Sequence, residues 1–117
     1  MTADNSLFFM PLLVGSIFFV MGFIMYKFPP KEINYLYGYR TSNSMKSKER
    51  WDFAQVYSAK LMIYCGVFLM IFSGFGLVFH LPISRGVFVS SIAIFVSLGV
   101  LIYKTERAIT QKFGKED

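Results

Sequence analysis

Three long stretches without a charged side chain constrain what this chain can fold into. They cover residues 7–26, 61–79 and 87–103, and none contains Asp, Glu, Lys or Arg. A helix rises 1.5 Å per residue, so about 20 residues cross a hydrocarbon core of about 30 Å. The third stretch has 17 residues, so it needs little tilt, local thinning, or help from Tyr103 and Lys104 at the interface. We therefore expect three transmembrane helices.

The composition agrees with a lipid environment. Hydrophobic residues make up 55% of the chain and aromatic residues 19%, which exceeds what one small water-soluble core can bury. None of the three stretches alternates polar with apolar residues, as a strand of a membrane barrel would. The predicted fold class is an all-α membrane protein, with residues 1–117 forming a single domain and a large loop, residues 27–60, between the first two spans.

The distribution of Lys and Arg predicts the orientation. Eleven of these residues lie in the large loop or after residue 103, and only Arg85 lies in the short second connection. The positive-inside rule then places the large loop and the C-terminus in the cytoplasm, and the N-terminus outside it. The net charge of +5 also occurs in nucleic-acid-binding proteins. Topology and contact with membrane lipids account for the same residues, so we expect no direct nucleic-acid partner.

Small residues in the spans indicate how the helices pack, because lipid offers no hydrophobic drive to bring helices together. The stripes that we expect to meet are Gly15 with Gly22, Gly66 with Ser73, and Gly86, Ser90, Ala93 and Ser97. The serines of the third span could instead line a polar path. Hydroxyls inside a helix can bond to a carbonyl of the preceding turn, which favours the packing interpretation.

The large loop begins with two prolines. Pro29 and Pro30 should end the first helix, since proline has no amide donor and restrains the residue before it. A turn should follow, where Gly38 could adopt a positive φ. Tyrosines alternate on either side of this glycine and would place amphipathic rings at the headgroup level; they are Tyr35, Tyr37 and Tyr39.

A helix should resume near Ser47, a plausible N-cap, with Glu49 in its first turn. Apolar and small residues then recur on one side, and no proline follows before Pro82; they are Trp51, Ala54, Ser58 and Leu61. We expect an interfacial helix that continues into the second span. Its aromatic side chains would anchor it at the membrane surface; they are Trp51, Phe53 and Tyr57.

The loop contains the pattern N-x3-G-Y-R-T, a short linker rich in Ser and Lys, and then E-x-W-x-x-A. The residues that carry it are Asn34, Gly38, Tyr39, Arg40, Thr41, Ser42, Glu49, Trp51 and Ala54. This pattern resembles the signature loop of the SdpI family, bacterial membrane proteins named for immunity to a sporulation-delaying toxin. Two positions depart from it: Gln55 stands where the family tends to have Asn, and Tyr35 where Pro often follows the first Asn.

The resemblance implies a toxin-immunity or signal-transducing receptor in the bacterial cytoplasmic (inner) membrane. The family's founding member protects its cell from a secreted peptide toxin and sequesters an autorepressor at the membrane. The resemblance therefore implies two partners, a peptide toxin and a cytoplasmic transcriptional regulator. The founding member has additional membrane segments, and this chain resembles its C-terminal module.

We expect the binding residues in the loop. The candidates are Asn34, Gly38, Tyr39, Arg40, Thr41, Glu49, Trp51 and Gln55. Arg40 could hold a carboxylate or a lipid phosphate through its planar donors, while Asn34, Thr41 and Gln55 could form a polar pocket against Trp51. The same residues also have a structural interpretation, in which Arg40 fixes topology, Gly38 turns the chain and Trp51 anchors a helix.

Two other function classes stay open. A lipid-headgroup-handling enzyme would need reactive groups near the interface, and Asp52 with Trp51 and Arg40 could form a headgroup site. Glu49 and Asp52 among basic neighbours read instead as a solvated charged face, so no catalytic residue is expected. The third class is an accessory or scaffold subunit of a membrane complex, or a homo-oligomer. The lone Cys65 and lone His80 predict no metal site, and no cofactor is expected.

Overall fold

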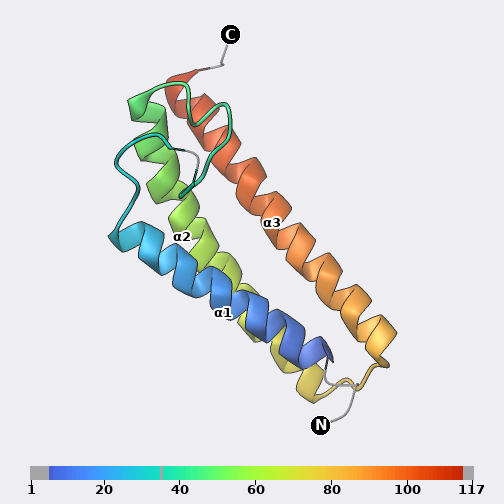
Figure 1. Ribbon diagram of the computed structural model, residues 1–117. Coiled ribbons are helices and arrows are strands. Elements are labelled where there is room, and N and C mark those ends of the chain that lie inside the picture. Colours follow the sequence, from blue (N-terminus) through green and yellow to red (C-terminus); the bar gives the residue numbers. More distant parts are fainter. Residues whose placement is uncertain (1–5, 35, 115–117) are drawn as a thin grey trace.

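A computed structural model describes residues 6–34 and 36–114 (Figure 1). Within these ranges the regular structure is helical: α1 (Ser6–Lys27), α2 (Lys48–Ser73), the short 3₁₀ helix η2 (Gly74–Leu77) and α3 (Ile83–Phe113). The three long helices are each long and apolar enough to cross a membrane. The predicted all-α fold with three spans is confirmed.

The first helix ends where the two prolines predict. The amide of Phe28 still donates to the Ile24 carbonyl at 2.7 Å, and α1 itself ends at Lys27. Pro29 and Pro30 have no amide hydrogen with which to continue the ladder. The chain therefore leaves the helix as an irregular connection, residues 28–47, which we call the motif loop.

The second helix begins at the expected cap. Ser47 has extended backbone angles (φ −155°, ψ 163°), and its Oγ accepts a hydrogen bond from the Arg50 amide at 3.2 Å. Glu49 lies in the first turn, where the helix dipole favours an anion. From there α2 runs for 26 residues without a break. The interfacial segment and the second span therefore form one continuous helix, as expected.

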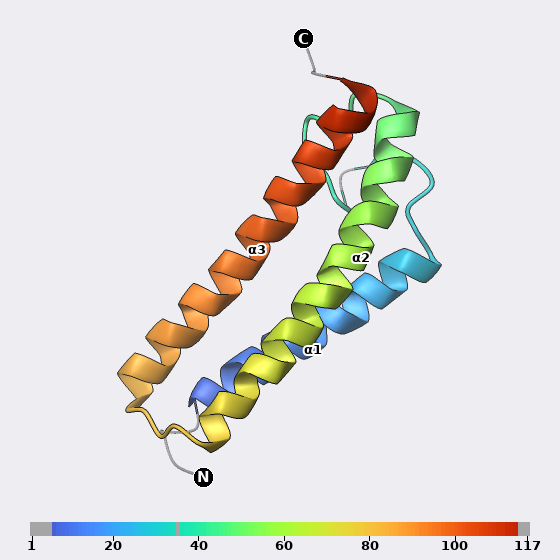
Figure 2. The same cartoon turned by 180° about the vertical axis from the view of Figure 1, so that it is seen from behind.

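The third helix is longer than its uncharged stretch. α3 comprises 31 residues and extends beyond residue 103 to Phe113. Figure 2 shows that α2 and α3 both project past the end of α1 on the side of the motif loop. The apolar stretch of α3 is thus continuous with a polar segment that reaches the loop.

Small residues bring the helices together. A Cβ added to Gly66 would lie 2.6 Å from the Gly15 carbonyl oxygen, and one added to Gly15 would lie 2.8 Å from the Gly66 oxygen. On α3, Ser97 is buried and its carbonyl accepts a weak hydrogen bond from the Cys65 thiol at 3.5 Å. Gly86 is also buried, against Ser6 of α1. The expectation that the small-residue stripes meet is confirmed for Gly15 and Gly66, whereas Ser97 and Gly86 contact residues outside the predicted stripes.

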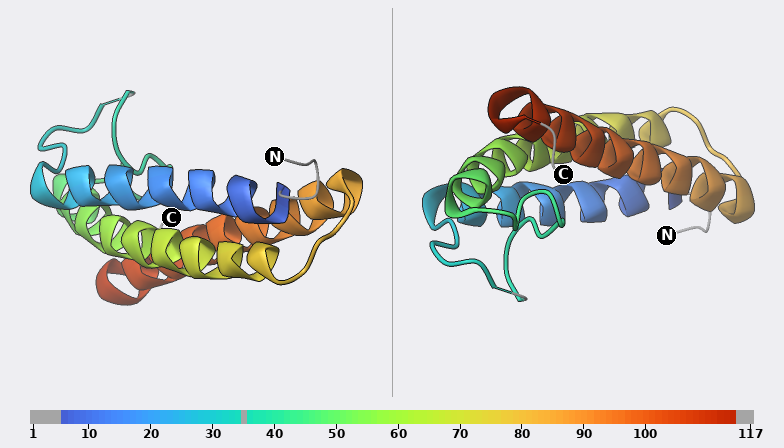
Figure 3. Two further views of the ribbon diagram at one scale, coloured as in Figure 1. Left: turned by 90° about the horizontal axis from the view of Figure 1, so that it is seen from below. Right: turned by 90° about the horizontal axis from the view of Figure 1, so that it is seen from above.

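The bundle opens towards the motif loop. α1 and α3 lie near each other where α1 begins and diverge towards the end of α1 (Figures 1 and 2). The motif loop lies at this wider end, beside the end of α1, as the views from below and from above also show (Figure 3). The candidate site is therefore built where all three helices and the loop come together.

Candidate functional site

Gln55 holds the motif loop on α2. Its side chain is fully buried, its Oε1 accepts a hydrogen bond from the Tyr39 amide at 2.7 Å, and its Nε2 donates to the Tyr39 carbonyl at 2.8 Å. One side-chain amide thus satisfies both backbone polar groups of a buried loop residue. The structure assigns Gln55 a positioning contact that its residue type alone did not reveal.

Gly38 is required by this contact. Its φ is +108°, in the region that favours glycine, as the sequence predicted. A Cβ at this position would lie 2.5 Å from Gln55 Oε1 and 2.7 Å from Pro30 Cγ. Both the backbone angle and the close approach of Gln55 therefore demand a glycine.

Trp51 lies beneath the loop. Its side chain is fully buried, and its indole Nε1 donates to the Pro30 carbonyl at 2.8 Å. The expectation that Trp51 anchors α2 at the membrane surface is wrong, because the polar tip of the ring finds a carbonyl of the protein's own loop. The indole of Trp51 instead links α2 to the connection that follows α1, through its hydrogen bond to Pro30.

Tyr39 and Thr41 converge on a single carboxylate of α3. The Tyr39 hydroxyl and the Thr41 hydroxyl each donate to Glu106 Oε2 at 2.6 Å. Tyr39 is buried, so the expectation that its ring lies among the headgroups is also wrong. Burial raises the pKa of the Tyr39 phenol far above its ordinary value, and the hydrogen bond and charge of Glu106 raise it further. The phenol is therefore held as a neutral donor.

Glu106 was not among the residues selected from the sequence. It is the lone acidic residue of α3 and lies between Lys104 and Arg107. In the sequence it therefore resembles one more charged residue of a polar tail. Its position just after the uncharged stretch 87–103 is the feature of the sequence that could have identified it. Intramembrane and interfacial carboxylates commonly have a specific partner, and here that partner is the motif loop.

Further hydrogen bonds tie the loop to itself and to the end of α3. Ser44 is fully buried; its Oγ accepts from the Thr41 amide at 2.9 Å and donates to the Thr41 carbonyl at 2.9 Å. Arg50 donates to the Asn43 side chain and, at 3.0 Å, to the Gly114 carbonyl. These contacts fix the second half of the loop between the start of α2 and the end of α3.

The other predicted residues have separate roles. Asn34 forms a local turn, its Oδ1 accepting from the amides of Leu36 at 2.9 Å and Tyr37 at 2.8 Å. The carboxylate of Asp52 is about half exposed and pairs with Lys48 at 2.9 Å. The headgroup site considered around Asp52 is thus not buried, whereas Asp52 lies on a solvated charged face, as expected. Tyr35 lies outside the described residues.

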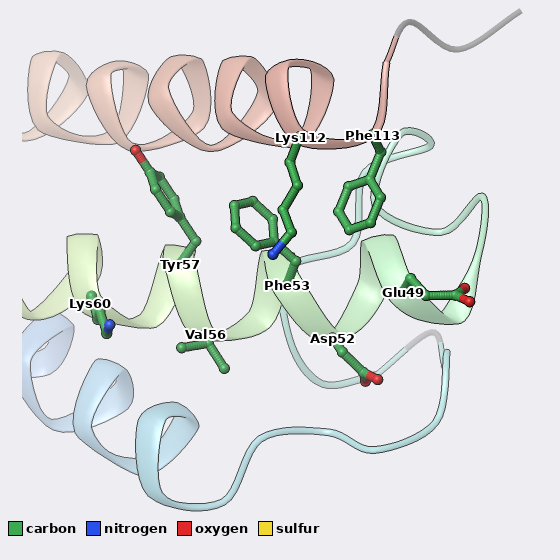
Figure 4. A pocket seen from close by; sticks show the side chains of 8 residues that line it. All are labelled: Glu49, Asp52, Phe53, Val56, Tyr57, Lys60, Lys112 and Phe113. Carbon is green, nitrogen blue, oxygen red and sulfur yellow. The ribbon is translucent and has the colours of Figure 1, made fainter.

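Two hollows adjoin this network. The first, of about 230 Å³, lies under the motif loop and is bordered by Arg40, Thr41 and apolar side chains of all three helices. The second, of about 520 Å³, lies between the projecting ends of α2 and α3, and Glu49 lies at its edge (Figure 4). There Lys112 extends from α3, and its Nζ lies 4.7 Å from the centre of the Phe53 ring. Among residues 6–34 and 36–114, no group of three His, Cys, Asp or Glu could hold a metal ion.

Comparison with known proteins identifies the family to which this chain belongs. Residues 31–104, more than half of the chain, match the model of the SdpI/YfhL protein family. The chain belongs to the SdpI/YfhL family. The matched region contains most of the motif loop, the whole of α2 and most of α3, so it includes Gln55 and its loop contacts.

One curated relative is the Bacillus subtilis (strain 168) protein named "Uncharacterized protein YfhL". It is 42% identical over 66 residues, which cover 56% of this chain and 57% of the relative. The aligned part thus spans just over half of the relative's length. No solved structure matches the chain.

Proposed function

We propose that this protein is a receptor in the bacterial cytoplasmic membrane that confers immunity to a membrane-active peptide toxin, or signals its presence to a cytoplasmic regulator. One observation carries the proposal: Tyr39 of the motif loop contacts all three helices. It packs with Met25 of α1 and Ala59 of α2, and its hydroxyl bonds to Glu106 of α3. Any peptide that shifts one helix against another must therefore strain or release the loop.

The loop is suited to two arrangements. Its shortest hydrogen bonds to α3 are the two to Glu106, supplemented by a longer one from Asn43 to Thr110 at 3.4 Å, while the buried Gln55 amide attaches it to α2. A displacement of α3 would break the first set and leave the second intact. A ligand that favours the displaced helix arrangement would shift the population towards a released loop, in proportion to its differential affinity.

Charge supports the direction of signalling. The loop 27–60 and the tail carry eleven of the twelve cationic residues, so the positive-inside rule assigns this end to the cytoplasm. A secreted peptide would reach the protein from the opposite side or from within the bilayer, and a regulator would meet the loop. The three helices connect the two sides.

The experiment compares survival of a sensitive bacterial host, with and without this protein, under a panel of membrane-active peptide toxins. The informative variants are Arg40→Ala, Trp51→Ala and Tyr39→Phe, the last of which removes only the hydroxyl that reaches Glu106. Leu36→Ala, at a loop residue that is 92% exposed, is the matched control. We expect protection by the wild type and by the control, and its loss in variants that are still inserted in the membrane.

Absence of protection against every peptide in the panel would overturn the immunity proposal. It would favour the accessory-subunit interpretation, for which a stoichiometric partner that co-purifies with the protein is the readout. Retained protection in Tyr39→Phe would instead show that the Tyr39 hydrogen bond to Glu106 is not used.

A further inference from the structure

The hollow under the motif loop is lined mainly by apolar side chains. Its floor is apolar and comes from three helices, Met25 of α1, Met62 of α2 and Leu101 of α3, with the exposed Ile102 at its edge. Its upper border is formed by the loop, where Arg40 and Thr41 lie. The cavity of about 230 Å³ is therefore mostly apolar, and the loop residues Arg40 and Thr41 lie on its border.

The cavity is open on one side. Met25 and Leu101 are buried, whereas Ile102 is 43% exposed and Arg40 is exposed. These two exposed residues border the cavity, which lies between the last turn of α1 and α3. The two helices diverge towards the end of α1 (Figures 1 and 2). In a bilayer this side faces lipid, because α1 and α3 are both membrane spans.

The depth of the cavity coincides with the membrane boundary. Leu101 and Ile102 belong to the last turn of the uncharged stretch 87–103, and Lys104 begins the charged segment of the same helix. Hydrocarbon ends and headgroups begin at this level. The apolar floor thus lies at the depth of acyl chains, and Arg40 lies on the side of the phosphates.

We propose that this cavity binds one acyl chain of an anionic phospholipid, with the lipid phosphate at Arg40. An apolar space open to the bilayer is accessible to lipid chains, and the two methionines provide adaptable walls. A guanidinium matches a phosphate with two parallel hydrogen bonds, and it favours anionic lipids over neutral ones. This inference goes beyond the receptor role, because the bound lipid would brace α1, α3 and the loop in the absence of any toxin.

The test measures lipid retained by the purified protein in native mass spectrometry. The detergent-solubilised protein is titrated with phosphatidylglycerol, with phosphatidylcholine, and with inorganic phosphate alone. We expect one tightly held phosphatidylglycerol per chain, weaker retention of phosphatidylcholine, and no competition by inorganic phosphate. Lipids retained in several copies without preference for phosphatidylglycerol would be adventitious, and they would overturn the proposal.

Two kinds of variant locate the site. Ile102→Trp narrows the mouth of the cavity at an exposed position, so the fold is not at risk, and Met62→Trp fills the floor. Leu98→Trp, on the same helix and 37% exposed, is the control because Leu98 does not line the cavity. We expect both cavity variants to lose the retained phosphatidylglycerol and the control to keep it.

Variants of Arg40 test the proposed contact with the lipid phosphate separately. Arg40→Gln should weaken phosphatidylglycerol binding about tenfold, the effect of losing a charge-assisted hydrogen bond, and Arg40→Lys should weaken it less. Equal retention in Ile102→Trp, Arg40→Gln and Leu98→Trp would overturn the proposal. The readout is lipid binding alone, so its outcome is distinguishable from that of the survival experiment.

Discussion

Tyr39 and Glu106 are 67 positions apart in the sequence, and the Tyr39 hydroxyl donates a 2.6 Å hydrogen bond to the Glu106 carboxylate. The Thr41 hydroxyl reaches the same oxygen. One carboxylate of α3 thus accepts two hydrogen bonds from the motif loop at the wide end of the helix bundle. Together with Gln55 of α2, it makes the loop a fixed part of the bundle.

Glu106→Ala should lower the free energy of unfolding by about 2–3 kcal/mol, because it leaves two hydroxyl donors in a partly buried site without their acceptor. The measurement is thermal unfolding of the purified protein in detergent micelles. Glu32→Ala, at an exposed loop carboxylate, should change stability by less than about 0.5 kcal/mol. A Glu106→Ala protein as stable as Glu32→Ala would contradict the role of Glu106.

Gln55→Ala should cost about 1–3 kcal/mol, since the Tyr39 amide would stay buried without a partner and the Tyr39 carbonyl would keep only the bond from Ser44 Oγ at 3.2 Å. Chemical unfolding followed by circular dichroism gives the value. Gln111→Ala, at an exposed position of α3, serves as the control and should be close to neutral. If the two variants have the same stability, Gln55 does not hold the loop.

The raised pKa of Tyr39 predicts a dependence on alkaline pH. Below the ordinary tyrosine pKa of about 10, the phenol is neutral in both folded and unfolded chains, and its contribution to stability is complete. Above this pH the unfolded chain releases the proton while the folded protein retains it, so stability falls as pH rises. The stability advantage of the wild type over Tyr39→Phe should therefore shrink above about pH 10. A constant difference up to higher pH would argue against a buried, neutral phenol.

Gly66→Ala should destabilise the protein by about 1–3 kcal/mol through overpacking, because the added Cβ would lie 2.6 Å from the Gly15 carbonyl oxygen. Gly99→Ala is the matched control on α3, where no atom lies within 4 Å of the added Cβ. That control should be neutral or up to about 1 kcal/mol more stable, from helix propensity. Thermal unfolding of the two variants in the same detergent makes the comparison. Equal effects would mean that α1 and α2 do not cross at these glycines.

The helices could be predicted because lipid imposes strong local rules. Uncharged stretches define the spans, paired prolines end α1, and Ser47 caps α2 where its residue type and position indicate. The full length of α3 could not be predicted from its uncharged stretch, because helix continuation beyond residue 103 depends on polar residues that are equally common in loops.

The motif residues could be selected from the sequence, but their contacts could not. Gly38 was interpretable because a positive φ is a local property of the backbone. Trp51 was misread as a surface anchor, since the same amphipathic ring can bond to a headgroup or to the Pro30 carbonyl. Glu106 was missed because only the folded bundle brings α3 against the loop. Long-range partners of this kind are chosen by tertiary structure and leave no spacing signal.

The most direct measurement of the central claim is hydrogen–deuterium exchange of the peptide that covers residues 36–44, in the wild type and in Glu106→Ala. The Tyr39 amide is bonded to the buried Gln55 side chain, and the Thr41 amide is bonded to Ser44. We predict slow exchange of this peptide in the wild type, and faster exchange in Glu106→Ala with the helices unchanged. Fast exchange in both proteins would contradict the account, because the loop would then not be held on the bundle.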